Sequence, residues 1–94
     1  MMAHEETWNV RLSIDSSEDG GRMTRAEARL EDRPDTVLVT EGVARAHPAD
    51  ENVPDIGREL AAARALSELS HQLLHTTVQD IEAHTHERVT RLRV

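Results

Sequence analysis

The chain has 94 residues, a formal net charge of −7, no cysteine, and Trp8 as its one aromatic residue. This length holds a single domain with a small core, which without Phe or Tyr must be built from Leu, Val, Ile and Ala. The acidic balance disfavours binding to nucleic acid or to an anionic membrane. The lack of cysteine excludes a disulfide framework and a thiolate nucleophile.

The chain is expected to form one domain over residues 1–94, with tails at 1–6 and 87–94. No stretch of the sequence has an apolar run of signal-peptide or membrane-spanning length. We therefore expect a cytoplasmic protein that does not associate with membranes.

The first half of the sequence predicts three β-strands. Residues 7–15 and 23–31 alternate between apolar or small and polar side chains, which is the period of a half-buried strand. A third strand is predicted over 36–46, where Gly42 indicates a bulge or a close backbone approach. Polar turns around residues 16–22 and 32–35 connect the strands, so we expect an antiparallel meander.

The second half predicts a long amphipathic helix. Its apolar residues recur at steps of three and four or close to them: Ile56, Leu60, Ala63, Leu66, Leu73, Leu74, Val78 and Ile81. Asn52 and Asp55 resemble a capping box at its start. Thr77 with Asp80 can cap a fresh turn, so residues 53–84 form either one helix or a long helix followed by a short one.

Together these elements predict an α+β fold, a three-stranded antiparallel meander with a long C-terminal helix on one face. We expect the apolar stripe of the helix, with Ser70 as a small packed residue on it, to cover one face of the sheet. That face is formed by Trp8, Val10, Leu12, Ile14, Ala26, Ala28 and Leu30. Substituting Leu60 or Leu73 by alanine should then cost about 2–5 kcal/mol.

Three segments carry a resemblance to a known family: GVARAHPAD at 42–50, IGRELAAARALSEL at 56–69 and DIEAHTH at 80–86. Their combination resembles a family of small uncharacterised actinobacterial proteins, a domain of unknown function among the dsRBD-like folds. The resemblance implies the same sheet and helix, and it brings no activity or catalytic residue. The Lys-rich patch of double-stranded RNA-binding domains has no counterpart here, since the chain contains no lysine.

The sequence predicts that the sheet face opposite the helix is an interaction surface. Val37, Leu38 and Val39 are consecutive, so the third strand shows apolar groups on both faces, and one helix covers only one of them. We expect a homodimer or larger assembly, joined through this face or through the edge of the third strand, or contact with another protein. The candidate interface residues are Val37, Val39, Val43, Arg11 and Arg25.

Two other function classes remain as alternatives. The first is nucleic-acid binding through the sheet or the arginines. The second is metal binding by His71 and His75, which share a helix face at a spacing of four, with His84 and His86 as further candidates. A metal site needs three or four converging ligands, so we predict no metal, no cofactor and no catalytic residue. Self-association without enzymatic activity is the preferred interpretation.

Overall fold

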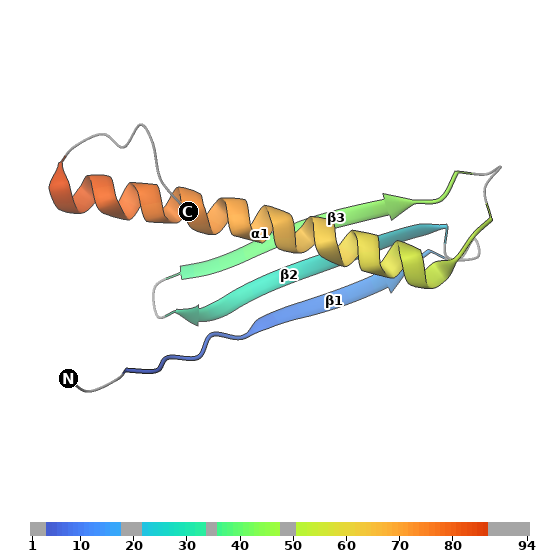
Figure 1. The fold of residues 1–94 in the computed structure, drawn as a ribbon, viewed down its shortest axis with the longest axis horizontal. Helices are drawn as coiled ribbons and strands as arrows, with labels where there is room; N and C mark the ends of the chain where they lie inside the picture. Colours follow the sequence, from blue (N-terminus) through green and yellow to red (C-terminus); the bar gives the residue numbers. More distant parts are fainter. Residues whose placement is uncertain (1–3, 18–21, 34–35, 48–50, 87–94) are drawn as a thin grey trace.

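The computed structural model describes residues 4–17, 22–33, 36–47 and 51–86. It contains four elements: β1 (Val10–Ser16), β2 (Met23–Arg33), β3 (Thr36–Arg45) and α1 (Pro54–Thr85). The strands form one antiparallel sheet in the order β1-β2-β3, and α1 crosses one face of it (Figure 1). The predicted α+β fold, a meander with a long C-terminal helix on one face, is confirmed.

The strand register confirms the predicted alternation. Ala26 and Ala28 are buried beneath α1, whereas Arg25 and Glu27 are exposed on the opposite face. Gly42 pairs regularly with Ala26, and the irregularity in the β2–β3 ladder lies between Leu30 and Arg33. The prediction for Gly42 is therefore wrong for the bulge and right for the close approach.

The helix is continuous over 32 residues, which settles the alternative of a second short helix. Its N-cap is Val53, without a side-chain capping bond, so the predicted capping box is wrong. Pro54 follows at the first helical position, where its fixed φ starts a helix and its missing N–H costs nothing. The Thr77 hydroxyl donates to the carbonyl oxygen of Leu73 at 2.9 Å and begins no new turn.

The buried face of α1 is not the predicted stripe. Ala61, Ala65 and Leu69 are buried, whereas Ile56 is 58% exposed and Leu60 is 41% exposed. Three other members of the expected face, Ala63, Leu66 and Ser70, are exposed as well. The stripe was predicted from hydrophobicity, but the packing is decided by side-chain size.

Gly42 explains why small residues face the sheet. A Cβ atom built at this position would lie 2.3 Å from the carbonyl oxygen of Ala61 and 2.4 Å from the backbone nitrogen of Ala65. The helix backbone therefore rests almost directly on β3, as only glycine permits. The Thr40 hydroxyl fastens the same contact by donating to the carbonyl oxygen of Ala65 at 2.7 Å.

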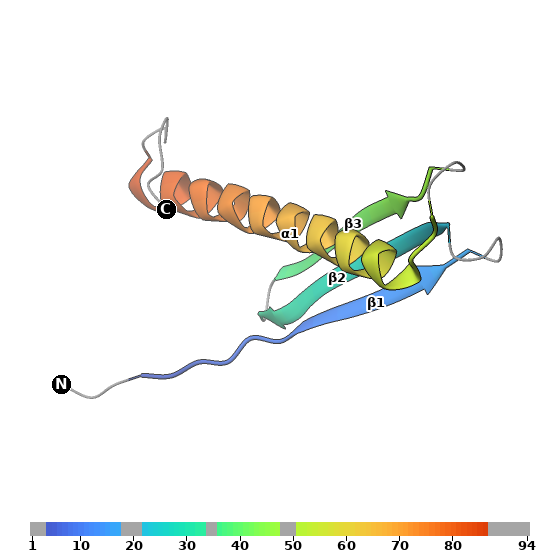
Figure 2. The same ribbon diagram turned by 45° about the vertical axis from the view of Figure 1, so that its right-hand side comes forward.

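This position of α1 leaves β1 largely uncovered. Leu12 and Ile14 lie on the same sheet face as Ala28 and Ala26, as predicted, but α1 packs mainly over β2 and β3 (Figures 1 and 2). A helix is about 10 Å wide and strands lie about 4.8 Å apart, so one helix covers roughly two strands. The expectation that the helix also covers Trp8, Val10, Leu12 and Ile14 is wrong.

Candidate interaction surface

An exposed row of apolar side chains on the helix side of the sheet follows β1. Trp8, Val10, Leu12 and Ile14, here called the β1 row, have exposed fractions of 42%, 43%, 38% and 43%. The strand parity turns all four side chains towards the layer that holds α1. A row of this kind, flanked by a helix, is typical of a contact surface.

The core beneath α1 is made of much smaller side chains than the β1 row. Its seven buried apolar residues are five alanines and two leucines: Ala26, Ala28, Ala44, Ala61, Ala65, Leu30 and Leu69. The largest apolar side chains of the chain thus lie mostly outside the core.

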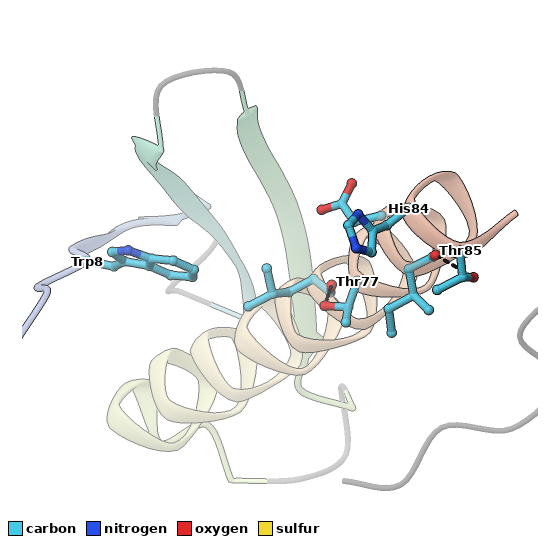
Figure 3. Close-up of a pocket in the computed structure, with 7 residues that line it drawn as sticks. Trp8, Thr77, His84 and Thr85 are labelled. Carbon is cyan, nitrogen blue, oxygen red and sulfur yellow. Dashed lines mark hydrogen bonds between the residues drawn. The ribbon is translucent and has the colours of Figure 1, made fainter. Parts of the chain in front are cut away.

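A hollow of about 470 Å³ lies between the start of the β1 row and the second half of α1. Trp8 forms one side, and Leu73, Thr77 and Ile81 form much of the other. Figure 3 shows the indole ring extending towards the helix, with Thr77 on the facing side. The indole Nε1 donates to the Glu6 carboxylate at 2.5 Å, so its polar atom is satisfied while the ring stays open to a partner.

The two edges of the sheet differ in their protection. The N–H of Ser17 donates to the carbonyl of Met23 at 2.8 Å, and hydrogen-bonded pairs recur at every second residue. The N–H and C=O groups of Val10, Leu12 and Ile14 therefore point outwards from β1.

At the other edge a helix side chain covers β3. The guanidinium of Arg64 donates from Nη1 to the carbonyl oxygen of Val43 at 2.6 Å. The N–H of Ala46 donates to the carbonyl of Arg22, and the same alternation turns the Val43 carbonyl away from β2. A helix side chain thus covers one outward carbonyl near the C-terminal end of β3, which is one way in which proteins protect a sheet edge.

The sequence-predicted interface residues share the outer face of the sheet. Val37 and Val39 are 56% and 46% exposed, and Val43 is partly buried. Arg25 is paired with Glu41 at 2.8 Å across β2 and β3. Arg11 lies on β1, at the far edge of the same face, so charged groups separate it from the valines.

The candidate metal ligands do not converge among the residues that the structure describes. His71 and His75 lie exposed on α1, and within the described segments no three His, Cys, Asp or Glu side chains are grouped as a metal site would require.

The carboxylates of Glu27 and Glu31 lie 3.7 and 3.2 Å from the guanidinium of Arg29, as expected for ion pairs on a strand face. Among the helical residues described, none forms a segment apolar and long enough to cross a bilayer.

The chain is a small two-layer α+β domain, an antiparallel sheet in the order β1-β2-β3 with one long helix on one face. The chain belongs to the Rv2632c-like family, which it matches over residues 6–90. It is 51% identical over 80 residues to the uncharacterised protein MT1780 of Mycobacterium tuberculosis, covering 85% of this chain and 81% of the relative. It is 52% identical over 75 residues to the uncharacterised protein Rv2632c of the same species, covering 80% of each.

A solved structure shows the same fold. The crystal structure of Rv2632c superposes with a TM-score of 0.81 at 42% sequence identity, covering 93% of this chain and 99% of that one. The relatives are named as uncharacterised proteins, so they assign no function.

Sequence reasoning found the residues of the β1 row but placed them in the core. The sequence signal that α1 lies away from β1 is Gly42 on β3. It lets the helix backbone pack closely over β3, at the other edge of the same sheet face.

Proposed function

We propose that this chain is a non-enzymatic cytoplasmic protein that acts by contact, through association with a second copy of itself. The observation that carries the proposal is the inverted placement of apolar side chains. Alanines fill the core, while Trp8, Leu12 and Ile14 remain about two-fifths exposed on one continuous row. Burying large apolar side chains is the main source of association free energy, and aromatic residues are frequent anchors of interfaces.

Two surfaces compete for this contact. The outer face offers Val37 and Val39, as the sequence predicts, but the Arg25–Glu41 pair lies between the strands of that face. The β1 row carries no charged side chain and adjoins an open sheet edge. We therefore place the contact at the β1 row and keep the outer valines as the rival.

The mass in solution tests the proposal. Sedimentation equilibrium of the full chain at micromolar concentration should give close to twice the chain mass of 10.5 kDa. A mass near 10.5 kDa throughout the concentration series would refute self-association. If a dimer forms, Leu12→Arg should dissociate it and Val39→Arg should not, with circular dichroism confirming that the helix is retained. The opposite pattern would assign the contact to the outer face.

A further inference from the structure

We propose that two copies join by antiparallel pairing of their β1 strands about a two-fold axis at Ser13, forming one six-stranded sheet with both α1 helices on the same face. This inference rests on the proposed self-association and specifies its geometry. The partner is a second copy of this chain because the edge is complementary to itself in side-chain parity, in length and in charge, as set out below.

Parity limits the pairing to few registers. Residues directly opposite in an antiparallel ladder point to the same sheet face, and a shift by one residue reverses every side chain. Residues on the helix side of β1 must therefore oppose residues on the helix side of the partner's β1, which also sets both helices on one face. The N–H and C=O groups that point outwards from β1 belong to Val10, Leu12 and Ile14, which share this parity. In these registers they therefore form hydrogen bonds with the partner strand.

Length selects the register centred on Ser13. Strand β1 spans Val10–Ser16, and Ser13 is its middle residue. Centring the axis there pairs the whole strand with its copy and sets Leu12 opposite Ile14 of the partner subunit. Moving the centre to Leu12 or Arg11 leaves residues at the end of each strand unpaired.

Charge selects the same register. The centre at Ser13 sets Arg11 opposite Asp15 of the partner subunit, twice by symmetry. Within the described part of the chain, neither Arg11 nor Asp15 has an ion-pair partner, and Arg11 lies opposite Arg29 of its own sheet. The carboxylates of Glu27 and Glu31 pair with Arg29, so Asp15 of the partner subunit would supply an opposite charge to Arg11 itself. An axis at Arg11 would instead oppose the two Arg11 side chains.

Single cysteines test this geometry, because the chain has none of its own. Ser13 would face its own copy in a non-hydrogen-bonded pair, where Cα atoms lie about 4.5 Å apart, within the range for a disulfide. Under mild oxidation, Ser13→Cys should give a covalent dimer quickly at the concentrations where the wild-type chain sediments as a dimer. Glu27→Cys is the matched control, since Glu27 lies beside Ser13 on the same face but on the central strand.

The positions four residues apart identify the register. Arg11→Cys and Asp15→Cys should each crosslink slowly alone and rapidly when the two variants are mixed. Rapid crosslinking of Arg11→Cys alone would overturn the register. A wild-type dimer in which Ser13→Cys crosslinks no faster than Glu27→Cys would overturn the β1 pairing while leaving self-association intact. A wild-type monomer would overturn both.

A charge exchange gives an independent readout. Arg11→Asp should raise the dimer dissociation constant about tenfold, since it opposes two carboxylates at both ends of the pairing. Adding Asp15→Arg should restore the wild-type value. An Arg11→Asp dimer of unchanged affinity would contradict the predicted ion pair.

Discussion

The contact between Gly42 and α1 makes the strongest prediction of the fold. In Gly42→Ala the new Cβ would lie 2.3 Å from the Ala61 carbonyl oxygen and 2.4 Å from the Ala65 nitrogen, where ordinary contact begins at 3.4 Å. Both atoms belong to the helix backbone, so no side chain can rotate away. The helix must move outwards by roughly 1 Å, and a gap of that size forfeits a quarter to a half of each dispersion contact.

The expected cost follows from the contacts that this movement disturbs. Overpacking of this kind costs about 1–3 kcal/mol. The bond from Thr40 to the Ala65 carbonyl contributes about 1 kcal/mol more if it breaks. Alanine also lowers the conformational entropy of the unfolded chain, which offsets less than about 1 kcal/mol of this loss of stability. We expect a net loss of about 2–3 kcal/mol, in urea unfolding followed by circular dichroism at one fixed protein concentration.

Gly57→Ala is the matched control. Gly57 lies on the same face of α1, but an added Cβ would meet only side-chain atoms of Thr24, the hydroxyl oxygen at 3.1 Å and Cβ at 3.8 Å. Alanine also favours a helix by about 1 kcal/mol over glycine, so this variant should be neutral or more stable. If Gly42→Ala loses less than about 0.5 kcal/mol, the close approach of helix and strand does not determine the packing.

Three further predictions follow from named contacts. Leu69→Ala should cost about 2–4 kcal/mol in urea unfolding because Leu69 is 6% exposed. Leu60→Ala should cost less than half as much, since Leu60 is 41% exposed. Equal losses of stability would contradict the observed buried face of the helix. Thr40→Val keeps the side-chain shape and removes the bond to Ala65, so it should cost about 1 kcal/mol by the same measurement, and an unchanged midpoint would show that the bond adds nothing. Arg64→Met uncovers the Val43 carbonyl at the β3 edge, so light scattering should detect species larger than the dimer; an unchanged mass would show that Arg64 does not protect the edge.

The strands were predictable because their side-chain period is two and one face is buried. Alternation in β1 and β2 identified which side chains share a face, and the register confirms it. The helix was predictable in length, but its buried face was not. Ile56 and Leu60 dominate a hydrophobicity pattern, while the true contact follows the row Gly57, Ala61, Ala65.

Size matching was the missing criterion. The sheet offers a floor of small residues, Ala26, Ala28 and Gly42, and a helix can approach such a floor closely only with a small-residue row of its own. The same criterion bears on the interaction surface. Parity assigns the β1 row to the helix side of the sheet, but only the position of Gly42 on β3 indicates which strands remain uncovered.

The unequal protection of the two edges bears on the size of the assembly. A three-stranded sheet with two open edges can add strands on both sides, and repeated pairing of this kind would extend into a filament. Arg64 covers the outward carbonyl of Val43 on β3, whereas the outward groups of Val10, Leu12 and Ile14 lie on the strand that α1 contacts least. Pairing through β1 alone uses the open edge once per chain, so the proposed assembly closes as a symmetric dimer, with an Arg64-capped β3 at each end of its sheet.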